Sequence, residues 1–159
     1  MVGMASEAVS TQSLEYARFL AREPFWRRFL GVQLPYRWNI RRLNLGFVLD
    51  VGAGAGRNLM HLRGNGIGVE PNPHSVFEMR ARGLTAYTVE EFFASSYAKK
   101  GCFDSLLLSH VLEHLAPMDA VALLKRYAPF VRPGGKVVII TPQAKGYASD
   151  PTHLCYVDR

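Results

Sequence analysis

The chain of 159 residues is 48% hydrophobic and 20% charged, and its formal net charge is +6. This size and composition suit one soluble globular domain with a sizeable core, and no apolar run approaches the roughly 20 residues that a membrane-spanning helix needs. Residues 1–11 lack a basic region followed by an apolar core, so we expect no secretory signal and a cytoplasmic protein.

The positive charge is concentrated near the N-terminus, where residues 1–45 contain seven arginines against three acidic residues. An excess of arginines within a short segment attracts nucleic acid or acidic surfaces. The alternative interpretation is a solvated helix face with arginines near a bound carboxylate. Basic and aromatic residues are not interleaved as on a surface that stacks single strands, so nucleic acid is not the expected partner.

The same region predicts helical structure. From Ser13 to Leu30 apolar residues recur mostly at helical spacing, with a break or restart at Pro24, and residues 35–40 then lead into the first strand. We therefore divide the chain into an N-terminal helical segment, 1–45, and a domain of residues 46–159.

Residues 47–70 are the most informative part of the sequence. An apolar run ends at Val51 and meets the loop Gly52-Ala53-Gly54-Ala55-Gly56, a short helix follows over 58–63, and a second apolar strand, 67–69, ends on Glu70. Glycines let a backbone turn sharply and approach a ligand closely, and a carboxylate after the second strand can accept hydrogen bonds from two ribose hydroxyls. Together these features predict a site for a nucleoside-bearing cofactor.

The loop is G-x-G-x-G, preceded by Asp50, and not the dinucleotide pattern G-x-G-x-x-G. It resembles motif I of class I S-adenosylmethionine-dependent methyltransferases, in which Glu70 matches the acid that binds the ribose. A pyrophosphate clamp, as in a nicotinamide-dependent reductase, and a glycine-rich turn without a ligand are the competing interpretations. No Tyr-x-x-x-Lys pair is present to support a reductase.

The remaining elements alternate between helix and strand. A helix is expected from Pro73 to about residue 82, a strand over 84–89, a strand over 103–110, a helix from 117 or 118 to about 129, a tight turn over 132–136 and a strand over 137–141. Alternation with short connections predicts right-handed crossovers and an α/β fold: a Rossmann-like parallel sheet with helices on both faces. The strand ending at His110 and the Pro-Gly-Gly turn also resemble that methyltransferase family.

By the same resemblance, the N-terminal helices lie over the cofactor pocket. The family continues past the fifth strand with a helix and an antiparallel strand pair, and we expect this C-terminal strand pair to be missing, either by truncation or because a partner chain completes the sheet. The predicted cofactor-binding residues are Tyr36, Arg37, Asp50, Gly52, Ala53, Gly54, Gly56, Asn58, Glu70, Pro71, Glu90, Ser109 and His110. For Tyr36 and Arg37, a simple packing role is the alternative. Glu90 or Glu91, or a nearby backbone group, is the candidate for an adenine contact, with an exposed helix start as the alternative.

Catalysis is assigned to side chains that follow the fourth and fifth strands. Methyl transfer needs alignment of the acceptor with the methyl group and, for some acceptors, removal of a proton. His110 after the fourth strand, and Asp150 and His153 after the fifth, lie at the same edge of the predicted sheet, so they are the predicted catalytic residues. The alternative role for both histidines is to fix loops around the cofactor.

Metal binding is the next alternative. Residues 110–114 match the H-x-x-E-H pattern of some metallopeptidases, but that site needs both histidines on one helix, and here the first follows a buried strand. A divalent ion that orients acceptor hydroxyls stays open. Cys102 and Cys155 have no metal-ligand spacing and are expected to be free thiols.

The sequence thus predicts an S-adenosylmethionine-dependent methyltransferase. The segment Ser109–Leu112 lacks the Asn/Asp-Pro-Pro-Tyr motif of base amino-methyltransferases and looks more like that of bacterial methyltransferases of small metabolites or glycans. O-methylation of a sugar or another small hydroxyl compound is the preferred activity. A non-catalytic cofactor-binding subunit and a nucleic-acid or protein acceptor are the alternatives, and a homodimer is left open.

Overall fold

The structure, a computed structural model, describes residues 34–142. The expected helix over 13–30, and Asp150 and His153, lie outside the described residues. The elements, in chain order, are α3 (Leu34–Arg42), β1 (Val48–Val51), α4 (Arg57–His61), β2 (Gly66–Val69), α5 (Pro73–Ala81), β3 (Ala86–Tyr87), α6 (Val89–Ala94), β4 (Phe103–Ser109), η1 (Leu112–His114), α7 (Pro117–Tyr127), η2 (Ala128–Phe130) and β5 (Val131–Ile140).

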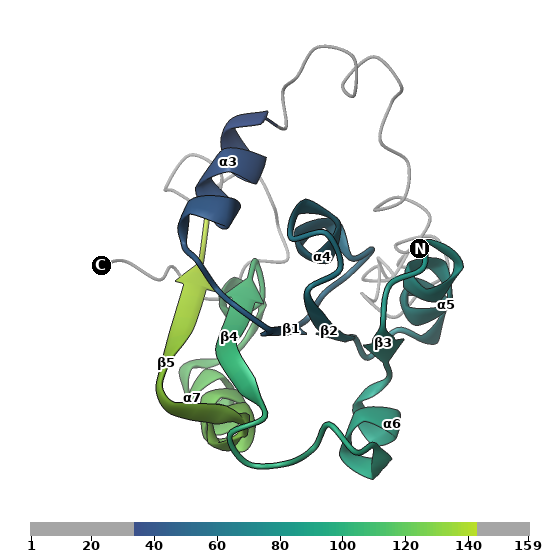
Figure 1. The fold of residues 1–159 in the computed structure, drawn as a ribbon. Helices are drawn as coiled ribbons and strands as arrows, with labels where there is room; N and C mark the ends of the chain where they lie inside the picture. The colour runs from purple at the N-terminus through teal and green to yellow at the C-terminus, as the bar shows by residue number, and fades with distance from the viewer. Residues whose placement is uncertain (1–33, 143–159) are drawn as a thin grey trace, which may run out of the picture.

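The strands form one sheet in the order β3-β2-β1-β4-β5, and all four pairings are parallel. The chain moves outward from β1 to β3, then returns to the other side of β1 to place β4 and β5 (Figure 1). The strand order therefore reverses between β1 and β4. In open parallel sheets, ligands bind outside the carboxyl ends of the strands at such a reversal.

Helices cover both faces of the sheet, as predicted. On one face, Leu49 and Leu106 belong to a core with the aromatic side chains of Phe92 and Tyr127, from α6 and α7. On the other face, α4 and α5 supply Leu59 and Met79 to a second cluster, and α3 contributes Ile40 to a third. Neighbouring residues of a strand serve opposite faces because side chains alternate along it.

The third strand is much shorter than the predicted 84–89. It ends at Tyr87 because Thr88 caps α6: the Thr88 side chain accepts the Glu91 N–H, while the Glu91 carboxylate accepts the Thr88 N–H. This capping box satisfies amide groups at the start of a helix. It converts the last residue of the predicted strand, Val89, into the first residue of α6.

Residues 132–136 do not form the separate turn that the sequence predicts before the fifth strand. They lie inside β5, where they form an irregularity in the pairing with β4. Phe103 pairs with Val131, but Ser105 pairs with Lys136, so five steps along β5 match two along β4. The extra residues include Gly134, at φ 75°. The Pro-Gly-Gly segment thus makes a bulge in an edge strand, where unpaired backbone is tolerated.

Residues 34–42 are helical, whereas the sequence suggested only a connection into the first strand. Tyr36 and Ile40 are four residues apart and share one side of α3, and Ile40 is buried at 1% exposure. The helix lies beyond the carboxyl end of β5 (Figure 1). Its burial against the sheet stabilises it, and Arg41 and Arg42 in its last turn favour the helix dipole.

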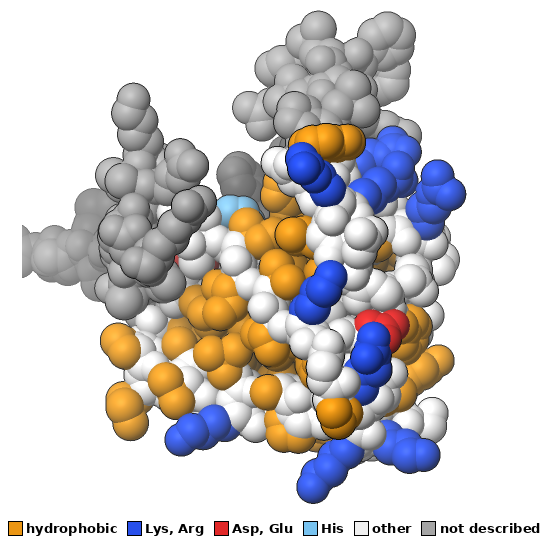
Figure 2. Space-filling view, turned by 60° about the vertical axis from the view of Figure 1, so that its left-hand side comes forward, with side chains coloured by type: hydrophobic (Ala, Val, Ile, Leu, Met, Phe, Trp, Pro, Cys, Tyr) orange, Lys and Arg blue, Asp and Glu red, His pale blue; other side chains and the backbone are white. Residues whose placement is uncertain are grey.

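Seen from the β5 side, hydrophobic side chains gather on the surface, with Lys and Arg around them (Figure 2). Val137 and Ile139 of β5 are 48% and 42% exposed. Within residues 34–142, no helix is long and apolar enough to cross a membrane.

Candidate functional site

The glycine loop follows β1 directly at the reversal of strand order. The N–H groups of Gly52 and Ala53 both donate to the carbonyl oxygen of Val69, at 2.8 and 3.2 Å, which ties the loop to the end of β2. Gly52 has φ 73°, and a Cβ on it would collide with the side chain of Val111. Glycine is therefore required here both by conformation and by the closeness of the segment after β4.

Glu70 lies beside this loop and holds it in place. Its Oε2 accepts the Gly54 N–H at 2.9 Å and its Oε1 accepts the Asn72 N–H at 3.1 Å. Burial raises the pKa of the Glu70 carboxyl, and the two backbone donors oppose this shift. Each carboxylate oxygen keeps further acceptor capacity for a ligand hydroxyl.

A chain of hydrogen bonds crosses the site from β4 to β1. The Tyr36 hydroxyl donates to Asn58 Oδ1 at 2.9 Å and lies 3.0 Å from Ser109 Oγ. Since the Tyr36 hydroxyl has one proton, the Ser109 hydroxyl donates to it. Asn58 Nδ2 in turn donates to Asp50 Oδ1 at 3.4 Å. Three predicted cofactor residues on α3, α4 and β4 are thereby brought together.

Asp50 is fully buried at the base of this chain. Burial raises the pKa of its carboxyl to about 7, with the hydrogen bond from Asn58 acting in the opposite direction and the charge of Glu70 adding to the rise. Asp50 Oδ2 has no hydrogen-bond partner within the described part of the chain. In this structure the Asp50 carboxylate accepts a hydrogen bond from Asn58 and so helps to orient that side chain. A direct contact of Asp50 with a cofactor stays a prediction.

His110 follows β4 at the same edge of the sheet. Its backbone has φ 57°, and its N–H donates to the carbonyl oxygen of Ile140 at 2.8 Å. The ring is 52% exposed, and its Nδ1 lies 3.2 Å from Oε1 of Glu113, which is only 1% exposed. A solvent-facing imidazole held by a buried carboxylate is an arrangement suited to proton transfer.

The other predicted cofactor residues lie in the loop, after Glu70, on α3 and on α6. Ala53 is buried against α4 and α5, and Gly56 caps α4 at φ 75°, where a Cβ would meet Leu84 and Met79. Pro71 is exposed directly after Glu70, Arg37 is exposed on α3, and Glu90 is exposed in the first turn of α6. The exposed helix start considered for Glu90 is thus what the fold contains, and its adenine contact stays a prediction.

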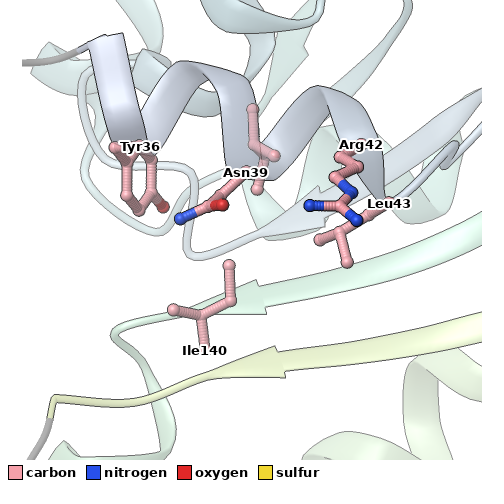
Figure 3. A pocket seen from close by; sticks show the side chains of 6 residues that line it. Tyr36, Asn39, Arg42, Leu43 and Ile140 are labelled. Carbon is pink, nitrogen blue, oxygen red and sulfur yellow. The ribbon is translucent and has the colours of Figure 1, made fainter.

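A pocket of about 450 Å³ lies between α3 and the end of β5. Figure 3 shows Asn39 and Arg42 pointing from the helix toward Ile140 across this gap. The lining residues are Tyr36, Asn39, Ile40, Arg42, Leu43 and Ile140. The pocket adjoins the site because Tyr36 reaches Ser109 and Ile140 binds the His110 backbone.

Among residues 34–142, no three His, Cys, Asp or Glu side chains are grouped so as to hold a metal ion. His110 stands in a left-handed turn after β4, while His114 ends the short 3₁₀ helix η1. The two histidines therefore do not lie on one helix, whereas a metallopeptidase site requires both on the same helix.

The sequence did not identify the roles of Glu113 and Asn72. The sequence presents Glu113 only within the zinc pattern; its place three residues after His110, beyond the end of a strand, is the signal that points to the pair. Asn72 donates its N–H to Glu70 and accepts the His74 N–H with its side chain, capping α5. An Asn before a Pro at a helix start is a recognisable cap.

Comparison with known proteins gives consistent results. Residues 17–157 match a family described as a methyltransferase domain. A SAM-dependent methyltransferase from Archaeoglobus fulgidus is 23% identical with a TM-score of 0.64, covering 84% of this chain and 66% of that one. The DhpI-SAH complex is 22% identical with a TM-score of 0.57, covering 81% and 66%.

A structure described by the conversion of a disulfide bond into a thioacetal group during echinomycin biosynthesis is 23% identical with a TM-score of 0.58, covering 72% of this chain and 52% of that one. At these identities the likeness shows a shared fold. This chain spans less than two thirds of the length of each of these three structures. A search of curated proteins found no match.

Proposed function

This chain belongs to the methyltransferase domain family, and from that premise we propose that it transfers the methyl group of S-adenosylmethionine to a small hydroxyl compound. One observation carries the proposal: the glycine loop, Glu70 and His110 meet at the reversal of strand order between β1 and β4. The domain division is part of the proposal, with residues 1–45 as a cover over the cofactor site and 46–159 as the binding domain.

The residues present fit an adenosyl cofactor. Gly52, at φ 73°, packs directly against the side chain of Val111, where a Cβ would collide, so the loop turns sharply at the carboxyl end of β1, where a ligand of such a sheet binds. Glu70 already aligns its two oxygens with the loop through Gly54 and with the following turn through Asn72. A ribose whose two hydroxyls donate to this carboxylate would therefore lie against the loop without a rearrangement of Glu70.

When bound, S-adenosylmethionine supplies a methyl group activated by its sulfonium. The glycine loop and Glu70 fix the position of the nucleoside. The series of hydrogen bonds that joins Ser109 to Asp50 holds α3 and α4 in place around it. Because transfer is an in-line displacement, alignment of the acceptor oxygen supplies much of the rate. His110 is the residue that we assign to take the acceptor proton. We keep Asp150 and His153, beyond β5, as proposed participants.

The pocket between α3 and β5 supports a small acceptor. Its volume of about 450 Å³ falls within the roughly 300–1,000 Å³ of small-molecule sites. Asn39 offers both a donor and an acceptor and Arg42 offers several donors, which suits a polyhydroxyl compound such as a sugar. Ile40 and Leu43 supply apolar contact for its carbon skeleton.

The test is turnover. The full chain is incubated with S-adenosylmethionine and a panel of sugars and small hydroxyl compounds, and release of S-adenosylhomocysteine is measured beside a His110→Ala variant. We expect acceptor-dependent release by the wild type and a rate roughly 10²- to 10⁴-fold lower in the variant, the usual contribution of a general base. Cofactor binding without turnover on any acceptor would instead favour a non-catalytic binding subunit.

A further inference from the structure

We propose that Glu113 is a positioning residue for His110: it holds the imidazole as the tautomer with the proton on Nδ1, which leaves Nε2 free as the base. The catalytic part of this inference rests on the proposed function. The positioning itself concerns two side chains of this chain and can be tested without cofactor or acceptor.

The pair is asymmetric in burial. The Glu113 side chain is 1% exposed and that of His110 is 52% exposed, with 3.2 Å between Oε1 and Nδ1. Glu113 Oε2 has no hydrogen-bond partner within the described part of the chain. Burial of a carboxylate costs free energy unless its oxygens accept hydrogen bonds. The contact with His110 is therefore a major interaction of the Glu113 carboxylate.

The backbone is shaped to make this contact. β4 ends at Ser109, and His110 takes a left-handed conformation, φ 57°, while its N–H is fixed to Ile140 of β5. The 3₁₀ helix Leu112–His114 follows at once. The left-handed turn at His110 followed directly by this helix brings Glu113 Oε1 back to within 3.2 Å of His110 Nδ1. A left-handed non-glycine residue is uncommon and such strain concentrates at functional sites.

The pair lies beside the proposed cofactor loop. Val111 stands between the two residues in the chain, and its side chain occupies the space where a Cβ of Gly52 would be. The glycine loop and the turn that carries the pair are therefore in direct contact. The exposed side of the His110 ring is the part that remains available to an acceptor.

The chemistry follows from the donor and acceptor inventory. An ionised carboxylate only accepts, so the contacting Nδ1 must carry the proton, and the Nε2 of the neutral ring then has a free lone pair. During transfer, a lone pair of the acceptor oxygen would form the O–CH₃ bond while the C–S bond breaks, and the electron pair of the broken C–S bond would stay on sulfur. The acceptor O–H proton moves to Nε2, and the carboxylate of Glu113 stabilises the imidazolium that results.

The experiment is ¹⁵N NMR of the full chain labelled at histidine. The chain has five histidines, and the signals absent from a His110→Gln variant identify His110. Long-range ¹H–¹⁵N correlations distinguish a ring protonated at Nδ1 from one protonated at Nε2. For the neutral ring we expect Nδ1–H in the wild type. A wild-type ring that is protonated at Nε2 overturns the proposal.

Variants then test the carboxylate. Glu113→Met keeps the length but removes the carboxylate acceptor, and Glu113→Asp keeps the charge but shortens the reach; both should lose the Nδ1–H preference. Glu78→Gln is the matched control, because Glu78 lies on α5 and pairs with Arg82; it should leave the His110 signals unchanged. An unchanged tautomer in a folded Glu113 variant refutes the role of Glu113. Should Glu113→Met not fold, the wild-type spectrum and Glu113→Asp decide.

These outcomes are separate from the proposed activity. An Nδ1–H ring that depends on Glu113, in a chain that transfers no methyl group, keeps the positioning and removes the proposed function. Turnover that depends on His110, with the ring protonated at Nε2, keeps the function and removes the positioning.

Discussion

Replacing Glu70 with Ala should weaken cofactor binding more than most single changes in this chain. The carboxylate accepts backbone N–H groups of Gly54 at 2.9 Å and Asn72 at 3.1 Å, and we assign its remaining lone pairs to two ribose hydroxyls. Hydrogen bonds to a charged group contribute about 1.5–3 kcal/mol each. Water replaces part of this in the partly exposed variant site, so we expect a loss of about 1–3 kcal/mol, or roughly 5- to 150-fold in Kd.

The assay is calorimetric titration of S-adenosylhomocysteine into the full chain. Glu78→Ala serves as the matched control, since its carboxylate is about half exposed on α5 and pairs with Arg82 at 3.4 Å. Such exposed pairs contribute little, so the control should bind like the wild type. A Glu70→Ala chain that keeps its unfolding midpoint and binds within twofold of the wild type would refute the ribose assignment.

Three further changes test other parts of the site. Gly52→Ala places a Cβ in the Val111 side chain at φ 73°, whereas Gly83→Ala meets nothing within 4 Å at φ 76°. Overpacking costs about 1–3 kcal/mol, so in urea unfolding the first variant should be less stable than the second by this amount, and equal losses would contradict the close packing. Tyr36→Phe removes two hydrogen bonds, each contributing about 0.5–1.5 kcal/mol, so the thermal midpoint should fall by several degrees; an unaltered midpoint would show that these bonds add no stability. Burial raises the pKa of Asp50 to about 7, so folding takes up a proton between its unfolded value of about 4 and that pKa, and stability falls as pH rises through this window. Asp50→Asn removes this dependence, and its stability relative to the wild type should therefore increase from pH 5 to pH 8 in urea titrations; the same difference at both pH values would refute the assignment.

The sheet could be predicted where residues next to each other in sequence determine the structure. The strand before Gly52, the strand before Glu70 and the strand before His110 are apolar runs with glycine or polar boundaries, and each was placed within one residue of its observed limits. The third strand was predicted too long because the capping box of Thr88 and Glu91 outweighs the strand preference of Val89.

The contacts that complete the site depend on tertiary structure and could not be predicted in this way. Tyr36 reaches Ser109, 73 residues away in the chain, only because Ile40 anchors α3 against the sheet. The contact between His110 and Glu113 depends on a left-handed residue at the end of a strand, a conformation that the residue types alone do not indicate. Loop composition indicated the glycine loop and Glu70, whereas the pocket beside α3 depends on packing between segments far apart in the sequence.

Calorimetric titration of the full chain with S-adenosylmethionine, S-adenosylhomocysteine and NAD tests the cofactor site directly. We expect micromolar binding of both adenosyl ligands at one site per chain and no heat from NAD. The glycines of the loop have the spacing G-x-G-x-G, whereas a dinucleotide clamp has the spacing G-x-G-x-x-G. Binding of NAD, with no binding of the adenosyl ligands by the folded chain, would show that the glycine loop and Glu70 do not form a site for S-adenosylmethionine.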